Sequence, residues 1–385
     1  MRILYCAADQ RVPGTVGGST HVRAVAEGLA ALGHDVHVAY TPGGDPPEGS
    51  GVTWHAMPPP LAETRLRMAL APRVTRLART LRPDLVVERY HNFGGEGIWA
   101  ALTVGVPSVL EVNAPVVDHP GSWKGRLDRA AVFHPLRRWR EWQCRQAALI
   151  VTPSAAIVPA WLPADRVLTI EWGADTTRFH PDATGRVPFT RDRGKVVAIF
   201  AGAFRAWHGA IHLVDAIDRL HARGEHDTVA VLVGAGPELA DVREAARRVP
   251  GVTVAGALPH EDMPAVLAAA DIGVAPFDIG RHAPLHLDFY WSPLKVFEYM
   301  AAGLPVVAPK LPRLAALVEN GREGLLYDAH DPGALASALA RLGDAALRRQ
   351  LGSHARTRAS AEYGWDVHCR RLEAAFTGIV QGETR

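Results

Sequence analysis

Cysteine is scarce in this sequence, and its three cysteines, Cys6, Cys144 and Cys369, lie far apart. None of them belongs to a CxxC pair or to a spacing that would ligate a metal ion. An odd number of separated cysteines does not make a disulfide framework, and this usage is typical of a reducing compartment. The sequence therefore excludes a small disulfide-rich protein and a cysteine-bound metal centre.

An excess of charge and long hydrophobic runs are also missing. The 42 Lys and Arg residues nearly balance the 40 Asp and Glu residues, which gives a net charge of +2. Without a basic tract, we expect no nucleic-acid partner. No run approaches the roughly 18 apolar residues that a membrane span needs. The N-terminal "MRILYCAADQ" resembles a short strand more than a signal peptide, so we expect a cytoplasmic protein.

What the sequence does have is a repeating alternation of strand and helix patterns. The chain has 385 residues, 48% of them apolar, which is enough for a large core and favours two domains. Short β-branched runs alternate with amphipathic stretches, as in parallel sheets covered by helices. Strands are predicted at 2–7, 35–40, 52–56, 84–88, 107–112, 148–152 and 167–170, then at 195–201, 228–233, 252–255, 271–275, 305–308 and 323–327.

The pattern stops once and then restarts. Residues 173–194 are rich in Gly, Pro and charge and lack periodicity, so they are predicted to link a domain over 1–172 to a second over 195–360. An amphipathic helix over 361–382 is predicted to follow. Trp365, Leu372 and Phe376 lie on its apolar side.

The most informative stretch is "YWSPLKVFEYMAAGLPVVAP", residues 290–309. A turn at Pro293 leads into an apolar helix, whose first N–H groups, those of Leu294 and Lys295, can hold a diphosphate. Lys295 adds positive charge. Glu298, one turn further on, can accept two hydrogen bonds from the vicinal hydroxyls of a ribose. An ordinary helix whose Glu caps a neighbour is the less favoured interpretation.

Two further junctions between strand and helix suit an anion. In "GTVGGSTHVRAVAEGL", Gly17 and Gly18 allow a close backbone approach and Ser19 or Thr20 can cap the helix, although a simple turn with positive φ explains the glycines equally well. In "FAGAFRAWHGAIHLVDAI", Gly202 permits a close turn. Arg205 can fork onto phosphate oxygens there, and His208 can add a donor.

These motifs, in this order, resemble the GT-B glycosyltransferases, in particular the retaining nucleotide-sugar enzymes of family 4. The resemblance covers nearly the whole chain and includes "PSVLEVNAP", "WGADTTRFHP", "VLVGAGPE" and "VAGALPHEDMPAVLAAADIGVAPF". It implies an α/β protein with two Rossmann-like, doubly wound parallel-sheet domains that face each other across a cleft. The final helix would pack back on the first domain, which binds the acceptor, and the second domain would bind the nucleotide sugar.

The resemblance also assigns roles to residues. Glu298 matches the second acid of a paired-glutamate motif that holds the donor ribose, and Leu294 and Lys295 match the phosphate-binding turn. Arg205 matches a base of the phosphate loop, and Gly18 matches the loop of the first domain near the diphosphate. The run 257–258, which ends at Leu258, lies where the nucleobase packs.

Three positions depart from the family pattern. Tyr290 stands where the first glutamate of the pair would fall, and His208 stands where the phosphate loop usually has a lysine. Asn113 stands at the position of a histidine that often lies near the reacting sugar. These departures concern the donor-sugar contacts and the pH dependence more than the nucleotide.

The mechanism implied is transfer with retention. The leaving diphosphate accepts the proton of the acceptor, and Arg205 and Lys295 stabilise the growing negative charge. No pair of carboxylates has an evident metal-binding placement, so no metal ion and no other cofactor is expected. A saccharide or a natural-product core is the expected acceptor, with these residues of the first domain as candidate contacts: Arg89, His91, Glu111, Asn113 and Asp118.

One segment suggests a further partner. Residues 126–146 combine six arginines with Phe133, Trp139 and Trp142, which suits weak peripheral contact with an anionic membrane. A solvated helix with its tryptophans in the core explains the segment better.

Other functions stay open from the sequence. An inverting transferase would need a positioned base, such as His91 or Asp118. A GT-B-shaped nucleotide-sugar epimerase is a further alternative. An NAD-binding enzyme is less favoured because "VLVGAGPE" holds only part of the glycine fingerprint. A non-catalytic nucleotide-sugar-binding partner is an alternative because of Tyr290.

Overall fold

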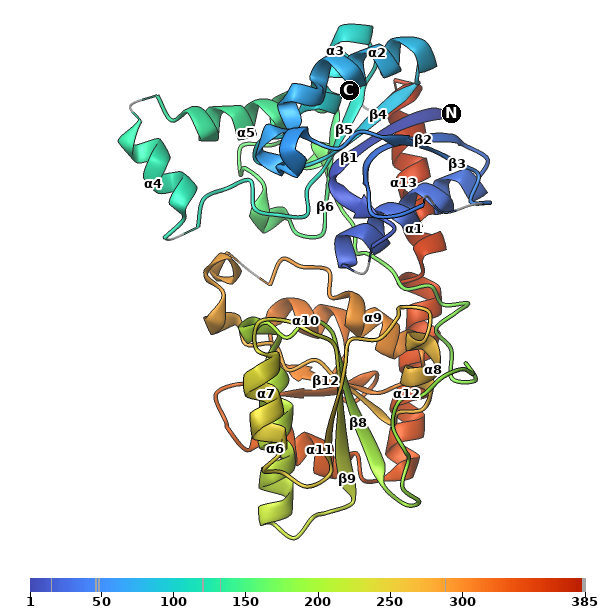
Figure 1. Ribbon diagram of the computed structural model, residues 1–385, viewed down its shortest axis with the longest axis vertical. Helices are drawn as coiled ribbons and strands as arrows, with labels where there is room; N and C mark the ends of the chain where they lie inside the picture. Colours follow the sequence, from blue (N-terminus) through green and yellow to red (C-terminus); the bar gives the residue numbers. More distant parts are fainter. Residues whose placement is uncertain are drawn as a thin grey trace. The chain divides into compact units, whose positions relative to one another are not determined.

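The computed structural model describes residues 1–14, 16–45, 47, 49–119, 121–131, 133–287 and 289–382. The chain forms two compact units. Unit 1 comprises Met1–Trp172, Tyr290–Ser292 and the described chain from Trp365 onwards. Unit 2 comprises Gly173–Phe289 and Pro293–Gly364. Each unit contains one parallel sheet with helices on it (Figure 1).

The sheet of unit 1 has seven strands in the order β3-β2-β1-β4-β5-β6-β7. All of its neighbouring strands pair in parallel, for example Ile3 with Val36 and with Leu85. The strands are β1 (Arg2–Val12), β2 (Asp35–Pro42), β3 (Val52–Ala56), β4 (Leu85–Arg89), β5 (Ser108–Glu111), β6 (Leu149–Thr152) and β7 (Val167–Thr169).

Helices cover both faces of this sheet because the strands bury side chains on both sides. The helices of unit 1 are α1 (Gly17–Ala31), α2 (Ala71–Leu81), α3 (Glu96–Val104), α4 (Trp123–Ala130), α5 (Pro135–Gln146) and α13 (Trp365–Val380), with short 3-10 turns η1 (Pro60–Ala62), η2 (Thr64–Leu70), η3 (Ala155–Ile157) and η4 (Ala164–Arg166). Ile3 and Tyr5 of β1 share one buried cluster with residues of α1 and α13. Leu4 and Cys6 share another with α2 and α3. This alternation is the two-residue period of a strand.

The sheet of unit 2 has six parallel strands in the order β10-β9-β8-β11-β12-β13. They are β8 (Val196–Ala201), β9 (Thr228–Val233), β10 (Val252–Gly256), β11 (Ile272–Val274), β12 (Val306–Pro309) and β13 (Gly324–Tyr327). The helices are α6 (Ala210–Ala222), α7 (Leu239–Ala246), α8 (Met263–Ala268), α9 (Leu294–Ala301), α10 (Pro312–Leu317), α11 (Ala334–Arg341) and α12 (Ala345–Glu362), with turns η5 (Ala206–His208), η6 (Ile279–Arg281) and η7 (Ala283–His286).

The predicted fold class is confirmed. Both sheets are parallel and doubly wound, and each predicted strand range overlaps an observed strand. In each sheet the strand order reverses beside the first strand, between β1 and β4 in unit 1 and between β8 and β11 in unit 2. Ligands of such sheets bind at the carboxyl ends of the strands at this reversal.

The segment 173–194, predicted as a linker, belongs to unit 2. It has no regular helix or strand, but it packs against the unit. Phe179 is buried, and Arg356 of α12 donates to the carbonyl oxygens of Thr176 (2.8 Å) and Phe179 (2.7 Å). The lack of hydrophobic periodicity in this segment therefore reflects irregular structure that packs on unit 2, and not an unpacked linker.

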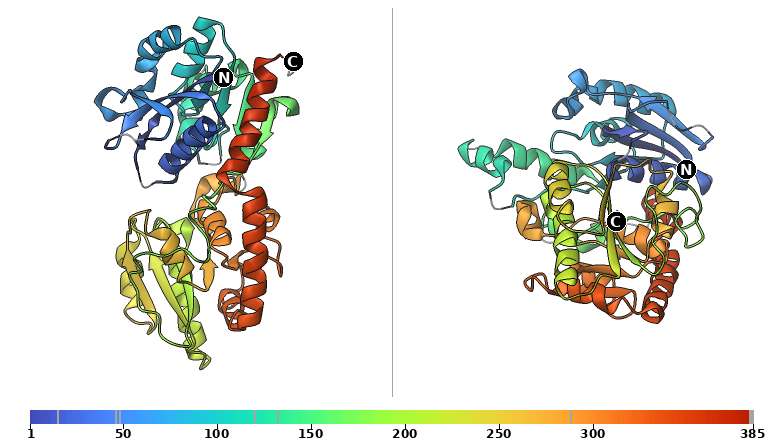
Figure 2. Two further views of the ribbon diagram at one scale, coloured as in Figure 1. Left: turned by 90° about the vertical axis from the view of Figure 1, so that its right-hand side faces the viewer. Right: turned by 60° about the horizontal axis from the view of Figure 1, so that its bottom comes forward.

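The last helix, α13, belongs to unit 1 and runs along α1 (red and blue in Figure 2). Leu372 and Phe376 are buried in the cluster that also contains Ile3 and Tyr5. Gly28 of α1 leaves the space that the Cys369 thiol occupies. Within the described residues, no helix has the length and apolar character to cross a bilayer.

Candidate functional site

Unit 2 gathers most of the predicted donor residues where its strand order reverses. The loop 202–209 leaves the carboxyl end of β8, and the loop 275–278 leaves that of β11. The backbone N–H of Asp278 donates to the carbonyl oxygen of Trp207 at 3.0 Å, which ties the two loops together. Their side chains therefore share one edge of the sheet.

Helix α9 brings Lys295 and Glu298 to this edge. Its Tyr299 packs on the sheet at Gly273, where a Cβ atom would lie 2.5 Å from the tyrosine ring. The Tyr299 hydroxyl accepts a hydrogen bond from the backbone N–H of Ala201 at 2.7 Å. The close packing that Gly273 permits fixes α9 against the end of β8.

The Lys295 amine is buried without a hydrogen-bond partner within the described part of the chain. Its Nζ lies 4.1 Å from the centroid of the Phe200 ring and 5.2 Å from that of Phe277. A Cβ atom on Gly202 would come within 2.8 Å of this Nζ. Burial lowers the pKa of Lys295 to about 7, although the nearby Glu298 carboxylate acts in the opposite direction. An unpaired buried donor is costly, so this amine is suited to a ligand anion.

The loop after β8 holds the two other predicted phosphate ligands. Burial and, to a smaller extent, the charge of Lys295 lower the pKa of His208 to about 2, so the imidazole is neutral. Its Nδ1 lies 2.6 Å from the carbonyl oxygen of Ala203, and its ring lies edge-on to Trp207 at 3.8 Å. Arg205 precedes η5, and its side chain is exposed. The loop therefore presents one permanent cation and one neutral histidine.

Glu298 has a neighbour that the sequence did not reveal. His260, in the loop between β10 and α8, places its Nε2 3.5 Å from a Glu298 carboxylate oxygen. The His260 ring lies edge-on to Phe179 at 5.9 Å. A single histidine in a loop has no recognisable sequence pattern of its own. Its position two residues after Leu258, in "ALPHED", was the one indication that it lies near the donor residues.

The remaining donor candidates divide between the units. Leu258 is half-buried in the same loop as His260, and Pro293 and Leu294 form the start of α9 in unit 2. Tyr290 is buried and belongs to unit 1, with its ring 4.7 Å from that of Trp291. The structure therefore groups Gly202, Arg205, His208, Lys295 and Glu298 in unit 2 but not Tyr290.

In unit 1, the glycine turn differs from its prediction. Helix α1 begins at Gly17 with Val16 as its N-cap, so Ser19 and Thr20 lie inside the helix and do not cap it. Neither Gly17 nor Gly18 has a positive φ. A Cβ atom on Gly18 would instead overlap the end of the Gln10 side chain, which would have to move.

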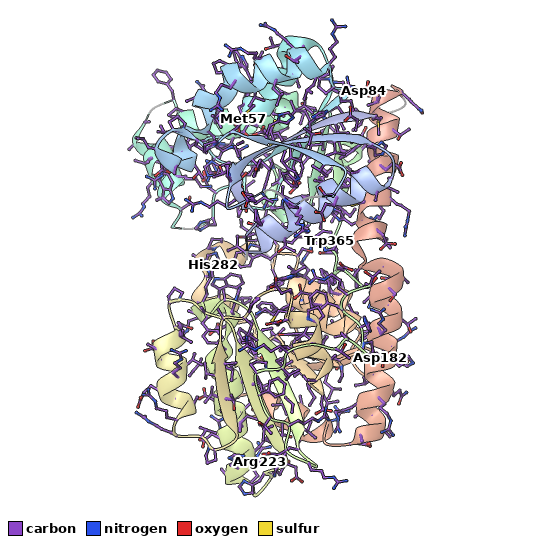
Figure 3. The ribbon with its side chains drawn as sticks, turned by 45° about the vertical axis from the view of Figure 1, so that its right-hand side comes forward. Met57, Asp84, Asp182, Arg223, His282 and Trp365 are labelled. Carbon is purple, nitrogen blue, oxygen red and sulfur yellow. The ribbon has the colours of Figure 1, made fainter. Side chains whose placement is uncertain are left out.

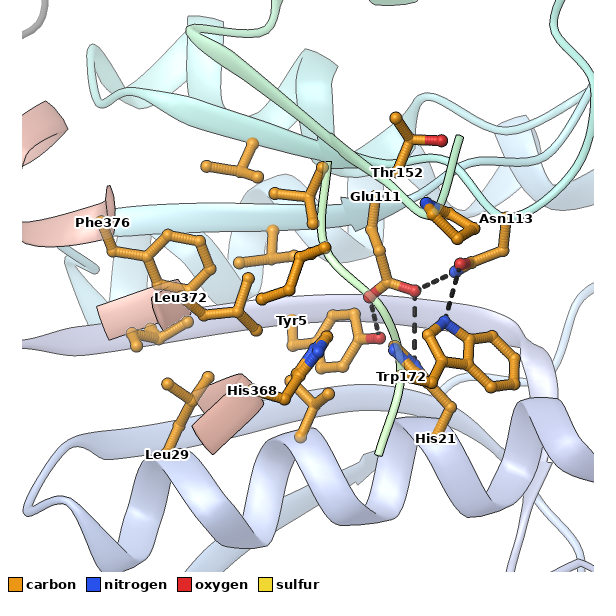
Figure 4. A pocket seen from close by; sticks show the side chains of 17 residues that line it. Tyr5, His21, Leu29, Glu111, Asn113, Thr152, Trp172, His368, Leu372 and Phe376 are labelled. Carbon is orange, nitrogen blue, oxygen red and sulfur yellow. Dashed lines mark hydrogen bonds and ion pairs between the residues drawn. The ribbon is translucent and has the colours of Figure 1, made fainter. Parts of the chain in front are cut away.

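Three predicted acceptor residues, Arg89, Glu111 and Asn113, meet in one network. Figure 4 shows the part of it formed by Glu111, Asn113, Tyr5 and Trp172. Arg89 donates to a Glu111 carboxylate oxygen at 2.6 Å. Asn113 donates to the same Glu111 oxygen, and the Tyr5 hydroxyl donates to the other. Trp172 donates from its indole N–H to the Asn113 amide oxygen at 3.0 Å. Both Glu111 oxygens are therefore engaged inside unit 1.

The cavity beside this network is small and largely apolar. The His21 ring is tilted against that of Trp172 with 4.4 Å between ring centroids, and burial lowers the pKa of His21 well below its usual value. The space is about 10 Å³, roughly that of one water molecule. It is too small for a sugar, so acceptor contacts by Arg89, Glu111 and Asn113 stay a prediction.

His91 and Asp118 lie apart from that network. Burial and the charge of Arg67 lower the pKa of His91 to about 4. Asp118 accepts hydrogen bonds from the Arg140 guanidinium at 3.1 and 3.2 Å. Asp118 is therefore engaged in an ion pair, and His91 is neutral at physiological pH.

A buried arginine, which the sequence analysis did not identify, binds several acidic side chains where the strand order of the unit 1 sheet reverses. Arg67 of η2 is fully buried and pairs with Glu96 (2.7 Å), Glu88 (3.0 Å) and Asp9 (2.8 Å). Arg89 also reaches Asp9, at 3.3 Å. Within the described ranges, no group of three or more His, Cys, Asp or Glu side chains is arranged to hold a metal ion.

Comparison with known proteins agrees with the fold. The family described as "Glycosyltransferase Family 4" matches residues 16–178, and that described as "Glycosyl transferases group 1" matches residues 195–344. The chain is 26% identical to a glycogen synthase of Mycobacterium tuberculosis over 419 residues, which covers 100% of this chain and 96% of that protein. It is 28% identical to a GDP-mannose-dependent alpha-mannosyltransferase of Mycolicibacterium smegmatis over 394 residues, which covers 97% and 96% of the two chains.

A solved structure gives the same fold. The structure of HepE from Anabaena in complex with UDP has a TM-score of 0.71 and 19% sequence identity, and the match covers 98% of this chain and 100% of that one. At this identity the similarity establishes the fold alone.

Proposed function

We propose a reaction for this chain, which belongs to the GT-B glycosyltransferases of the group 1 and family 4 type. It transfers a sugar, with retention, from a UDP- or GDP-sugar to a small polar acceptor. The acceptor class that we propose is a saccharide or a natural-product core. The proposal includes transfer without a metal ion.

The observation that carries the donor assignment is the Lys295 amine. It is buried, lacks a hydrogen-bond partner within the described residues, and lies under Gly202. Glu298 follows on the same helix by three residues, and Arg205 is exposed on the adjoining loop. Two cations and a helix N-terminus suit a diphosphate, and a carboxylate one turn away suits a ribose diol.

The proposed chemistry needs no protein side chain as base. The bond between the anomeric carbon and the β-phosphate oxygen breaks, and a bond from that carbon to the acceptor oxygen forms on the same face. The acceptor proton passes to a phosphate oxygen of the departing nucleoside diphosphate. Lys295 and Arg205 stabilise the charge that develops on the diphosphate, which is electrostatic catalysis by preorganised groups.

Similar proteins support a nucleotide donor but differ in the base. The mycobacterial relative is named for GDP-mannose, whereas the Anabaena protein binds UDP. For this chain we propose a uridine or guanosine diphosphate sugar. Leu258 and His260, both in the loop after β10, are the residues that we expect nearest the base and the ribose.

The experiment is a calorimetric titration with UDP, GDP, ADP and dTDP, followed by sugar derivatives of the nucleotide that binds. Turnover is then measured with and without EDTA, and the anomeric configuration of the product is determined by NMR. Binding of UDP or GDP, EDTA-resistant turnover and a retained configuration are expected. An inverted product contradicts retention, and nucleotide binding without turnover on any acceptor contradicts an enzymatic role.

A further inference from the structure

Helix α4 of unit 1 is inverted relative to an ordinary surface helix. Trp123 and Leu127 are 45% and 53% exposed, although they are its largest apolar residues. They are four residues apart and so lie on the same side of the helix. Lys124 and Asp128 are instead buried. The helix therefore presents its apolar side outwards.

The inward polar side of α4 is well paired, which fixes this orientation. Asp128 accepts a hydrogen bond from the backbone N–H of Leu136 at 2.9 Å and pairs with Arg140 at 3.3 Å. Lys124 donates to the side chain of Asn92 at 2.9 Å. Turning the helix over would expose these bonds to water and bury two apolar residues in a polar place, so the inversion is a built feature.

The exposed apolar residues are surrounded by positive charge. Arg126 and Arg129 of α4 are exposed, and Phe133, just after the helix, is 71% exposed. Residues 123–146 contain seven Lys and Arg against two Asp and Glu, in a chain whose net charge is only +2. We call Trp123, Arg126, Leu127, Arg129 and Phe133 the α4 surface.

The two acidic residues of this segment do not offset the charge of the α4 surface. Asp128 is buried against Arg140. Glu141 of α5 is shared between Arg137 at 2.8 Å and Arg145 at 2.9 Å. The tryptophans of α5 point inwards: Trp139 donates to the carbonyl oxygen of Gly94 at 3.0 Å and stacks on Trp142.

We propose that the α4 surface docks on a membrane that contains anionic lipids. Exposed Trp, Leu and Phe side chains with two exposed arginines between them in the sequence are suited to the boundary between headgroups and acyl chains. Helix α4 also projects from the edge of the unit 1 sheet, so it can reach a flat surface (Figures 1 and 2). The inference goes beyond the proposed transfer reaction, because it concerns where the enzyme works.

A second copy of the chain fits this surface less well. A two-fold contact would bring the arginines of one copy against those of the other. Three apolar side chains, two of them only about half exposed, offer much less than the ~800 Å² per partner of a stable interface. An anionic lipid surface complements the charge and needs only shallow insertion.

The test is flotation of the purified full-length protein with vesicles of phosphatidylcholine alone or with 30% phosphatidylglycerol. We expect binding to the anionic vesicles at 0.1 M NaCl and a loss at 0.5 M NaCl. Replacing both arginines, Arg126→Gln with Arg129→Gln, should lower the partition coefficient on the order of thirtyfold. Trp123→Ser with Leu127→Ser should lower it on the order of tenfold.

Matched controls separate this surface from general charge and apolar exposure. Arg247→Gln with Arg248→Gln removes two exposed arginines of unit 2, and Leu61→Ser removes an apolar residue that is 93% exposed elsewhere in unit 1. These variants should bind the vesicles as the parent does. Nucleotide binding and the melting temperature should stay unchanged in all variants. Equal losses in the controls, no binding to anionic vesicles, or a change of sedimentation coefficient in the Trp123 and Leu127 variant would each overturn the proposal.

Discussion

At the scale of single residues, the unpaired amine of Lys295 is the central feature of unit 2. A lysine is rarely buried without a partner, because its charged form is desolvated. Here it is held between two phenylalanine rings and a glycine. Burying the amine in this position lowers the stability of the protein without ligand. Because the amine has no hydrogen bond to a protein group, none has to be broken when it binds a ligand phosphate.

The cost of burying Lys295 predicts a pH-dependent stability. The folded pKa of about 7 lies below the usual unfolded value of about 10.4, so the unfolded state binds more protons between these values. The free energy of unfolding should therefore rise with pH, by about 2 kcal/mol between pH 7 and pH 9 from this group alone. We expect this increment in the parent and not in Lys295→Met, by urea unfolding at both pH values. Identical pH dependence in the two proteins would contradict it.

The same residue predicts uptake of a proton when nucleotide binds. A diphosphate favours the ammonium form, and His208 stays neutral beside it. At pH 8, calorimetry in buffers of different ionisation enthalpy should show uptake that approaches one proton per nucleotide. The uptake should vanish in Lys295→Met, and the affinity of the parent should fall as the pH rises above 7. Uptake that persists in the variant would assign the proton to another group.

Glu298→Ala should weaken nucleotide binding, because two ribose hydroxyls lose their acceptor. The expected loss is about 1–3 kcal/mol, measured by calorimetry with the preferred nucleoside diphosphate. Glu244→Ala, on the exposed face of α7 in the same unit, serves as the control and should leave the dissociation constant unchanged. An unaltered affinity in Glu298→Ala would remove the ribose assignment.

At the scale of elements, the turn from β8 towards α6 depends on the glycine at its start. Gly202 has a φ of +148°, and a Cβ atom there would meet the Lys295 Nζ. Gly224, at the end of α6, also has a positive φ (+80°) but no atom within 4 Å of a Cβ. Both glycines therefore have a positive φ, but only at Gly202 would an added Cβ atom contact another side chain.

This pair gives a prediction about the turn. Gly202→Ala and Gly224→Ala should each lower the free energy of unfolding by about 1–2 kcal/mol, because alanine disfavours a positive φ. Only Gly202→Ala should also lower nucleotide affinity, on the order of tenfold, because it displaces the Lys295 amine. Thermal unfolding and calorimetry on both variants separate the two effects. Equal affinity in the two variants would mean that the glycine serves the backbone alone.

The elements themselves were largely readable from the sequence, and their ends less so. Buried parallel strands are continuous runs of β-branched and apolar residues, and the range predicted for one of them, 228–233, was correct, whereas β1 runs to Val12, beyond its predicted range of 2–7. The start of α1 was wrong because Ser19 and Thr20 resemble caps, whereas Val16 occupies the cap position. Capping depends on backbone angles that a string of small residues does not specify.

The candidate site was predictable only where a motif carried it. The stretch from Pro293 to Glu298 combined a turn, a helix start and charge, and it does bring Lys295 to the end of β8. His260 was missed because its partner lies 38 positions away in the sequence. The burial of Arg89 and Glu111 was equally hidden, since charged residues are usually exposed and their pairing is a property of the sheet.

At the scale of the whole molecule, the chain leaves unit 1 after Trp172, contributes Tyr290–Ser292 to it, and returns to it finally at Trp365. The C-terminal helix thus completes a core that the N-terminal strand begins. The side chain of Trp365 marks the start of α13 (Figure 3), with its ring centroid 6.5 Å from that of Trp172. The core of unit 1 is therefore complete only when α13 is in place.

This role of α13 predicts that damage to the helix affects unit 1 and spares the donor site. Phe376 is 1% exposed in the core of unit 1, so Phe376→Ala should cost about 3–5 kcal/mol and lower the melting temperature of unit 1 by roughly 10 °C. Val380→Ala, on the same helix but 38% exposed, should stay within about 0.5 kcal/mol of the parent. Differential scanning calorimetry of both variants is the measurement, with the unfolding transition of unit 1 expected to shift. At 20 °C the nucleotide affinity of Phe376→Ala should equal that of the parent, because Arg205, Lys295 and Glu298 all belong to unit 2. A parallel loss of affinity would show that the donor site requires an intact unit 1.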